Sequence, residues 1–390
     1  SIAAGLQAVE LGRRIHYKEA KMMGQSGSAR YRRRTGLRKR RKPGGTARIF
    51  AAFSPAALCG VLFLYAGCAV VPPSTDAPAV RIDGIPGPED AVVDSYSKGT
   101  RLLVSSADRR GRGVPGEIYA VDTVTLEKFA LPRAGGPGGP SFSPHGLSLV
   151  TLSDGTRLLY VINHYPESDI ERYGVLPHSV LVYQVYNRSL SFVEEITDSL
   201  LVSPNDLSAL SDGTVYVSND GSGGGGMLEI ILGMERATVV MIPPRGEARI
   251  VAENLSMANG IQATEDELYL AATRENAVYR FSRRPDGTLS GRAELAYVKG
   301  PDNLTLTGEY IFAAAHLKDI ALARHMSNPE IPAPSVIYRI DRASGARVLV
   351  YADGGDTISA ASVAVPAEGF LFIGQIAGDF LIRVRDRSGR

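Results

Sequence analysis

Short apolar segments alternate with turn-forming pairs from Arg81 to the end of the chain, and no helical apolar period of useful length interrupts them. The turn signals include Asp154-Gly155, Asp212-Gly213, Pro285-Asp286-Gly287 and Ser344-Gly345. This series predicts an all-β architecture and argues against an α/β fold. The expected strands are 101–105, 117–121, 157–162, 180–185, 214–217, 267–271, 277–281, 310–314, 336–340, 347–351 and 370–373.

Polar clusters recur along the same region at a spacing that suggests a repeat. Successive clusters are 54–60 residues apart at first, and Asn259 is 44 residues before Asn303. Six units of about fifty residues match a six-bladed β-propeller with four strands per blade. In that fold we expect one loop of each blade to reach the central axis at the same end. The clusters are Glu89-Asp90, Pro144-His145-Gly146, Asn205-Asp206, Ala258-Asn259-Gly260, Asp302-Asn303 and 357–362.

The amino-acid composition further limits the kinds of propeller and metal site that this chain can form. With 44% hydrophobic and 22% charged residues, the 390-residue chain is typical of a globular protein, and residues 81–390 suffice for one propeller domain. The absence of Trp excludes the Trp-Asp propeller repeat. Both cysteines, Cys59 and Cys68, lie in the apolar segment 49–71, so the body has neither a disulfide framework nor a thiolate zinc site.

The N-terminal region differs from the body in charge. Residues 1–48 hold 14 Lys or Arg and two acidic residues, whereas the remainder holds 29 basic and 39 acidic residues. A basic, disordered segment 1–48 before the apolar segment 49–71 predicts an export signal or a membrane anchor. A basic tail before an acidic body does not indicate a nucleic-acid-binding domain.

The apolar segment ends in Leu64-Tyr65-Ala66-Gly67-Cys68, which resembles a bacterial lipoprotein cleavage box with Tyr65 in place of the usual Leu. We therefore expect an exported, membrane-tethered protein, either lipidated at Cys68 or held by an uncleaved anchor. Residues 72–80 are expected to be a linker. The sequence indicates no oligomeric state.

The recurring clusters are rich in oxygen donors, namely Asp and Glu carboxylates and Asn amide carbonyls. Calcium takes six to eight oxygen ligands of these kinds, whereas zinc and copper prefer His or Cys. Asn-Asp and Asn-Gly pairs are also ordinary turn formers. Their recurrence at blade-like spacing favours calcium in the central tunnel.

Taken together, these segments resemble the paraoxonase/arylesterase family in the family's own order, from about Ile82 to the last strand. No single segment is specific, but the combination is. The segments are Gly87–Asp90, Ser141–Ser148, Leu159–His164, Pro204–Leu207, Tyr216–Asp220, Met257–Ile261, Asp302–Leu304 and Leu371–Gly374.

The resemblance implies a calcium-dependent hydrolase of lactones and aryl esters with two calcium ions. A catalytic ion would be held by Glu89, Asn205, Asn259, Asp302 and Asn303. A structural ion would be held by Asp90, Asp206 and the backbone carbonyl of Leu147. Its binding free energy would then add to the stability of the fold.

The resemblance also implies roles for histidines. His145 and His164 match a dyad in which one imidazole activates water and the other orients it. His316 and Met257 match substrate-pocket positions, although Met257 replaces a typical aromatic residue. By contrast, we expect His178 and His325 to be structural.

One further departure from the family and two alternative functions remain. The disulfide that joins the two ends of the domain in animal members is impossible here, so closure of the ring must rest on strand pairing, with a possible contribution from calcium. A sugar lactonase of the gluconolactonase type is one alternative, against which the His145–His164 pair argues. A calcium-stabilised propeller that binds a ligand without catalysis is the other. The sequence does not identify the natural substrate.

Overall fold

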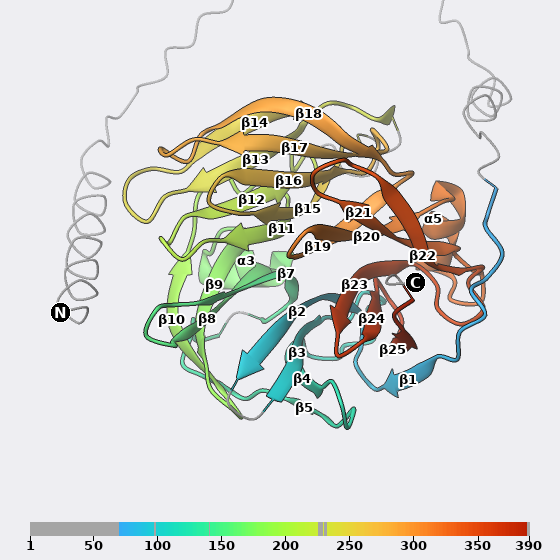
Figure 1. Ribbon diagram of the computed structural model, residues 1–390. Helices are drawn as coiled ribbons and strands as arrows, with labels where there is room; N and C mark the ends of the chain where they lie inside the picture. The colour runs from blue at the N-terminus through green and yellow to red at the C-terminus, as the bar shows by residue number, and fades with distance from the viewer. Residues whose placement is uncertain (1–69, 97–98, 140, 225–228, 230–231, 388–390) are drawn as a thin grey trace, which may run out of the picture. The chain divides into compact units, whose positions relative to one another are not determined.

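Six β-sheets are arranged around a central axis, like blades, in the computed structural model of the protein, which describes residues 70–96, 99–139, 141–224, 229 and 232–387 (Figure 1). The predicted six-bladed β-propeller is thereby confirmed. Each sheet runs antiparallel through consecutive strands, except for the short parallel pairing of β6 with β10. The first three sheets contain β2 (Pro88–Tyr96), β3 (Gly99–Ser106), β4 (Glu117–Asp122) and β5 (Lys128–Ala130); β6 (Arg133–Ala134), β7 (Pro144–Thr151), β8 (Arg157–His164), β9 (His178–Val185) and β10 (Leu190–Ile196); and β11 (Pro204–Ala209), β12 (Val215–Asn219), β13 (Ala237–Ile242) and β14 (Arg249–Leu255).

The second half of the ring repeats this arrangement. The remaining sheets contain β15 (Ala258–Ala263), β16 (Glu267–Ala272), β17 (Ala277–Arg283) and β18 (Leu289–Tyr297); β19 (Pro301–Thr307), β20 (Tyr310–His316), β21 (Ser335–Asp341) and β22 (Arg347–Asp353); and β23 (Ala361–Ala367), β24 (Phe370–Gln375) and β25 (Phe380–Arg385) with β1 (Val80–Asp83). The innermost strands β2, β7, β11, β15, β19 and β23 contact one another in this order, and β23 contacts β2. The inner strands therefore form a closed ring.

The last blade is completed by the first strand of the domain. β1 pairs antiparallel with β25, with Val80 opposite Arg383 and Asp83 opposite Phe380. Strand pairing between the two ends thus closes the ring without a disulfide. The preceding segment also lies against the propeller, because Thr75 exchanges hydrogen bonds with Ala352 of β22.

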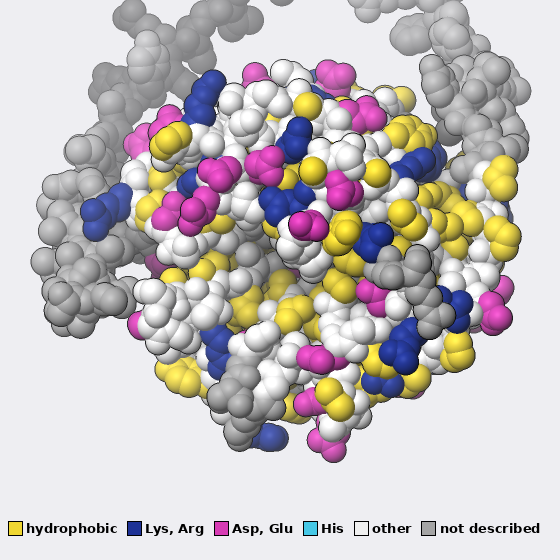
Figure 2. Space-filling model, in the orientation of Figure 1, with side chains coloured by type: hydrophobic (Ala, Val, Ile, Leu, Met, Phe, Trp, Pro, Cys, Tyr) yellow, Lys and Arg dark blue, Asp and Glu magenta, His cyan; other side chains and the backbone are white. Residues whose placement is uncertain are grey.

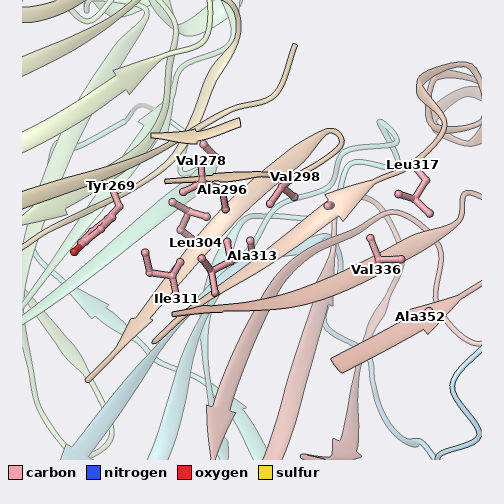
Figure 3. Close-up of a cluster of buried hydrophobic side chains, with 13 residues drawn as sticks. Tyr269, Val278, Ala296, Val298, Leu304, Ile311, Ala313, Leu317, Val336 and Ala352 are labelled. Carbon is pink, nitrogen blue, oxygen red and sulfur yellow. The ribbon is translucent and has the colours of Figure 1, made fainter. Parts of the chain in front are cut away.

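Apolar side chains fill the space between neighbouring blades. One cluster joins the blade of β15–β18, with Tyr269 and Val278, to the blade of β19–β22, with Leu304 and Val336 (Figure 3). Equivalent clusters lie between the other blades. Burial of this apolar surface is the main force that holds the blades together.

A buried ion pair connects the first two blades. Asp94 of β2 is fully buried and accepts hydrogen bonds from Arg101 of β3 at 2.8 Å and from Arg157 of β8 at 2.7 Å. Arg101 also donates to the backbone carbonyls of Tyr186 and Asn187, beyond β9. The pair therefore fixes one blade against the next at a point where both charges are removed from water.

Two short helices, α3 (Glu167–Tyr173) and α5 (Asp319–Ser327), lie in connections between strands. In the described ranges, we find no helix long and apolar enough to cross a membrane. The expectations for residues 1–48, the apolar segment 49–71 up to residue 69, and Cys68 lie outside those ranges. On the face shown in Figure 2, acidic and basic side chains are interspersed.

Candidate active site

The polar clusters seen in the sequence are the first residues of the inner strands, rather than the loops that we expected. Glu89, His145, Asn205, Asn259 and Asp302 are each the second residue of β2, β7, β11, β15 and β19. Strand patterns based on apolar residues miss these positions because their side chains point to a polar tunnel. All six inner strands begin at the same end of the ring.

An irregularity in pairing recurs at the start of every inner strand. The register between the inner strand and its neighbour shifts at the polar cluster in each of the six blades. β-Bulges re-aim side chains and are common next to active sites. Here the repeated bulge brings consecutive polar residues, such as Asn205 and Asp206, to different positions along the tunnel.

A backbone hydrogen bond holds each bulge in the same way. In every blade, the backbone carbonyl of the residue just before the inner strand accepts a hydrogen bond from a backbone amide at or just beyond the end of the second strand. The pairs, with the donor first, are Ala107 and Gly87, His164 and Ser143, Asp220 and Ser203, Thr273 and Met257, His316 and Gly300, and Ile376 and Ala360. In four of these blades the accepting residue has a left-handed backbone conformation, and two of the four, Met257 and Ala360, are not glycine. Such strain outside glycine is typical of functional sites.

Five polar side chains stand at the starts of the inner strands β2, β11, β15 and β19, and we call them the ring residues: Glu89, Asn205, Asn259, Asp302 and Asn303. All are buried, with Asn205, the most accessible, 8% exposed. Asn303 donates its amide to Glu89 at 3.0 Å, and Asn259 donates to Asp302 at 2.6 Å. The amide nitrogens are thus used between the ring residues, and the carbonyl oxygens remain.

Four buried oxygens of the ring residues have no hydrogen-bond partner: Glu89 Oε2, Asn205 Oδ1, Asn259 Oδ1 and Asn303 Oδ1. A buried acceptor without a partner costs about 1–3 kcal/mol, so a cluster of four is unfavourable unless a ligand satisfies it. His145 and Arg109 lie near the carboxylate of Glu89. Burial alone would raise the pKa of Glu89, but His145 and Arg109 outweigh it and lower that pKa.

A second acidic pair lies close to the ring residues. Asp90 accepts from the backbone amides of Ala91 and Leu147, and Asp206 accepts from those of Leu207 and Ile261. Each carboxylate thereby bridges its own inner strand to the next one. Burial, with Asp206 and Glu89 nearby, raises the pKa of Asp90, and burial also raises the pKa of Asp206, with contributions from Glu89 and Asp302. A bound cation would reverse this crowding of negative charge.

These residues fit a hard cation. No three His, Cys, Asp or Glu side chains within the described part of the chain are placed to hold a metal by themselves. A site at the ring residues would instead depend on three Asn carbonyls beside two carboxylates, and calcium accepts both kinds of oxygen. The unpaired oxygens therefore agree with the donor set that the sequence predicts for the first ion. The backbone amide of Leu147 donates to Asp90 at 2.6 Å, so Leu147 lies beside the carboxylate with which its carbonyl is predicted to share the second ion.

Three histidines, rather than two, form a chain beside the ring residues. His145 Nδ1 lies 2.8 Å from His164 Nε2, and His164 Nδ1 lies 2.8 Å from His178 Nδ1. The other ring nitrogen of His145, Nε2, is 3.3 Å from Glu89 Oε2. The expected pair of His145 and His164 is therefore in contact and directed at the ring. Burial, together with His145, His178 and Arg109, lowers the pKa of His164 well below its usual range, so this imidazole is neutral at neutral pH.

The two expected substrate-pocket residues occupy different surroundings. His316 is buried and its Nε2 lies 2.7 Å from Asp302 Oδ2, while its Nδ1 has no partner. It orients a ring carboxylate. Met257 directly precedes β15, is half-buried and has a left-handed backbone (φ 58°). His325 packs in α5 against the carbonyl of Ile331, in keeping with a structural role.

Sequence reasoning missed His178 and Arg109. His164 ends β8 and His178 begins β9, and the two are directly opposite in the antiparallel register. That relation was readable in principle, because a histidine at each end of one strand connection becomes a cross-strand pair. Arg109 donates to the carbonyl of Pro144 and lies near Glu89. It follows β3 in an irregular segment, so no pattern indicated its position.

A cavity of ≈360 Å³ lies at the other end of the strands, lined by residues such as Thr307, Tyr310 and Ala367. Thr307 ends β19, whereas the ring residues Asp302 and Asn303 stand near its start. This cavity is therefore remote from the candidate active site.

Comparison with known proteins agrees with this architecture. The chain is 29% identical over 276 residues to human serum paraoxonase/lactonase 3, covering 67% of this chain and 75% of that protein. It is 28% identical over 247 residues to mouse serum paraoxonase/arylesterase 1, covering 60% and 66%.

Solved structures share the fold at low identity. A gluconolactonase from Xanthomonas campestris superposes with a TM-score of 0.50 at 15% identity, covering 80% of this chain and 90% of that one. A luciferin-regenerating enzyme superposes with a TM-score of 0.52 at 10% identity, covering 80% and 96%. These likenesses support the propeller fold alone.

The Arylesterase family model matches residues 111–381, which is more than half of the chain and spans most of the propeller. The chain therefore belongs to the arylesterase family, an enzyme family that hydrolyses carboxylic ester bonds.

Proposed function

We propose that this protein hydrolyses lactones and aryl esters with a bound calcium ion and a histidine base. One observation carries the proposal: three buried Asn carbonyl oxygens of the ring residues have no partner, and Oε2 of the ring residue Glu89 lies 3.3 Å from His145 Nε2. Buried oxygens suited to binding a cation are thus near an imidazole suited to accepting a proton from water.

The ring residues would hold the catalytic ion, and Asp90, Asp206 and the carbonyl of Leu147 would hold a second, structural one. When bound at the ring, calcium supplies Lewis-acid polarisation of the ester carbonyl and charge stabilisation of the oxygen that becomes negative. His316 would keep Asp302 oriented through its 2.7 Å contact. The ring residues thereby fix where the carbonyl of the substrate must lie.

His145 would act as the general base. Its Nε2 faces the ring residues and takes a proton from a water molecule as the water attacks the carbonyl carbon. His164 lies 2.8 Å from the other nitrogen of His145 and keeps that imidazole oriented. On collapse of the tetrahedral species, the same Nε2–H protonates the departing alcohol oxygen.

Three further parts of the proposal concern substrate and location. Lactones and aryl esters are the proposed substrates because the named relatives are lactonases and arylesterases. Met257, next to the start of β15, would line the substrate pocket. Export and tethering to a membrane, through residues 49–71 or a lipid on Cys68, are proposed from the sequence alone.

Hydrolysis of phenyl acetate, γ- and δ-lactones and a sugar lactone, each with calcium and after its removal, tests the function. We expect turnover of aryl ester and lactone that disappears without calcium and returns with it. His145→Ala should lower kcat at least about 100-fold, as expected for loss of a general base, while calcium still stabilises the protein. His325→Ala, outside the site, is the matched control.

Three outcomes contradict the proposal. Turnover confined to the sugar lactone would favour a gluconolactonase-type enzyme. A folded protein that binds calcium but hydrolyses none of the substrates would be a binding module. Unchanged turnover in His145→Ala would exclude this histidine as the base.

A further inference from the structure

The connection between β3 and β4, residues 107–116, lies at the end of the tunnel where the inner strands begin, and we call it the arginine loop. Its side chains reach the blades on both sides of the first one. Arg109 donates a hydrogen bond to the backbone carbonyl of Pro144, at the start of β7. In the opposite direction, Arg110 donates to the carbonyl of Ala377, between β24 and β25. The arginine loop therefore lies along the entrance to the tunnel, beside the ring residues.

Two of the three arginines of this loop are engaged in holding it in place. Arg110 donates to three backbone carbonyls, one in the last blade and two near the end of α5. Arg112 forms ion pairs with Asp108 at 3.1 Å and with Asp379 at 2.7 Å. These contacts join the loop to the last two blades. They also fix the backbone on either side of Arg109, which lies between Asp108 and Arg110.

The guanidinium of Arg109 is much less engaged. It is half-buried and makes one hydrogen bond, from Nη2 to the carbonyl of Pro144 at 3.2 Å, and within the described ranges it forms no ion pair. A guanidinium has two forked edges of N–H groups, and a single hydrogen bond from Nη2 occupies only one of them. The other edge remains available. Because a charge that is partly removed from water is unfavourable without a partner of opposite sign, this edge suits an anionic ligand.

Arg109 lies close to the groups to which the reaction is assigned. Its charge acts on both Glu89 and His164, so the guanidinium is near the ring residues and near the histidines. Burial lowers the pKa of Arg109, and the carboxylate of Glu89 opposes this effect only in part. Arginine nevertheless stays charged at any physiological pH. Since Glu89 is a predicted calcium ligand, its charge would be used by the ion, and a further anion would be needed to compensate Arg109.

We propose that Arg109 is a specificity-determining residue that binds a carboxylate group of the substrate, an inference that rests on the proposed function. The preferred substrates are then lactones and esters that carry a carboxylate away from the bond that is cleaved. A carboxylate fits the free edge of the guanidinium through two parallel N–H···O hydrogen bonds. Because the arginine loop is anchored by Arg110 and Arg112, the bound carboxylate fixes how the ester carbonyl lies relative to the ring residues.

A matched pair of substrates tests the proposal. 4-Acetoxybenzoate and 4-acetoxybenzamide contain the same acetyl ester and differ only in a carboxylate and a neutral amide. We expect the wild-type protein to prefer the carboxylate in kcat/KM by about tenfold or more, through a lower KM. Arg109→Gln keeps an N–H donor for the carbonyl of Pro144 but removes the charge and the fork, and it should reduce this preference about 10- to 100-fold.

Two further variants separate the fork from the charge and the site from the loop. Arg109→Lys keeps the charge without the fork, and we expect it to retain part of the preference for the carboxylate. Arg112→Gln removes a charge from the same loop that is already paired with Asp108 and Asp379, and it is the matched control. The control should retain the wild-type preference. An unchanged preference in Arg109→Gln would overturn the proposal.

Isothermal titration calorimetry of the calcium-saturated full chain with 4-hydroxybenzoate gives a readout that is independent of turnover. We expect the Kd to rise about 10- to 100-fold in Arg109→Gln and to stay unchanged in Arg112→Gln. An equal Kd in wild type and Arg109→Gln would mean that the carboxylate binds elsewhere, such as at the calcium ion, and would overturn the proposal, as would no binding by the wild type. If the wild-type protein hydrolyses no ester, the proposed function fails, and calorimetry alone then decides whether Arg109 binds a carboxylate.

Discussion

Asn259 uses its amide group on Asp302 and leaves its carbonyl oxygen buried without a partner. The same division occurs at Asn303, whose amide donates to Glu89. An asparagine at such a position supplies a neutral ligand and at the same time fixes a charged one. Aspartate would donate nothing to its neighbour and would add a further negative charge to a buried group of carboxylates.

Asn259→Ala removes one of the unpaired oxygens and one contact to Asp302. We expect calcium affinity to fall about 10- to 100-fold, which reduces the calcium-induced gain in free energy of unfolding by about 1.4–2.7 kcal/mol. Calcium titration followed by thermal unfolding measures this change. Asn187→Ala, at an exposed position, is the control. An unchanged calcium response in Asn259→Ala would exclude Asn259 as a ligand.

Asp90 and Asp206 should make the effect of calcium depend on pH. Burial and neighbouring carboxylates raise both pKa values in the metal-free protein. Such groups contribute stability that is complete below their unfolded pKa of about 3.9 and is lost as the pH rises through the folded pKa. Calcium binds the ionised forms, so its stabilising increment should be larger at pH 8 than at pH 5, by about 1.4 kcal/mol for each tenfold gain in affinity.

Urea unfolding of metal-depleted and calcium-saturated protein at the two pH values provides this increment directly. Comparing the increments removes the contributions of groups that titrate far from the ions. An increment of equal size at pH 5 and pH 8 would contradict the prediction.

At the scale of strands, the inner strands carry the polar residues of the candidate site, and the second strands carry the apolar residues that stabilise the blades. All eleven segments that the apolar pattern predicts are strands in the structure, and none of them is an inner strand. Second strands such as β8 and β16 pair with a strand on each side and carry long apolar runs, so the sequence pattern predicts them. Inner strands begin with polar residues, and the pattern therefore assigned those residues to loops.

The candidate site shows a similar limit. The resemblance to the family suggested the ring residues, and the structure places all five at the starts of inner strands, with Asn303 hydrogen-bonded to Glu89 and Asn259 to Asp302. His178 was expected to be structural because a lone histidine in a strand-rich protein usually is. Its contact with His164 arises from the pairing register of β8 with β9, which becomes apparent only when the two histidines are placed at the facing ends of a strand pair.

The close approach of the inner strands β15 and β19 also explains why residue 260 is a glycine. A Cβ atom on Gly260 of β15 would lie 2.5 Å from the backbone nitrogen of Leu304 on β19. The neighbouring backbone has no freedom to move away without displacing Asp302 and Asn303. Glycine is therefore required here for the spacing of the ring residues rather than for its φ angle.

The buried ion pair of Asp94 should contribute more to the free energy of unfolding than exposed ion pairs do. Asp94→Ala would leave Arg101, which is 2% exposed, without its charged partner, and we expect a loss of about 3–5 kcal/mol in free energy of unfolding. Asp83→Ala breaks the exposed Arg81–Asp83 pair and should cost less than about 1 kcal/mol. Urea unfolding of both variants makes the comparison. Similar losses in the two would show that burial does not set the value of the Asp94 pair.

For the molecule as a whole, ring closure depends on a strand of four residues. Ile82 of β1 is 4% exposed and packs with Phe372 and Leu381 of the last blade. Ile82→Asp places a charge in that core, and we expect a loss of about 3 kcal/mol or more. Val80→Asp, at a position 43% exposed on the same strand, should have a much smaller effect.

Amide hydrogen exchange should show which strands the Ile82→Asp substitution destabilises. In Ile82→Asp we expect faster exchange first in β25 and β24, while β12 and β13 on the far side of the ring stay protected until global unfolding. Uniformly faster exchange in all blades would mean that the ring opens only as a single unit. A loss below about 1 kcal/mol would mean that β1 is not needed for closure.

The pairing of β1 with β25 also has a consequence for biosynthesis. The ribosome makes β1 before every other strand of the propeller and its partner β25 after all the others. The first strand must therefore wait through almost the entire translation of the domain, with its backbone groups unpaired and available to foreign edges. The last blade, and with it the complete tunnel, therefore forms only after β25 has left the ribosome. Closure of the ring is thus the last step of folding, and it joins the strand of the domain that is made first to the one that is made last.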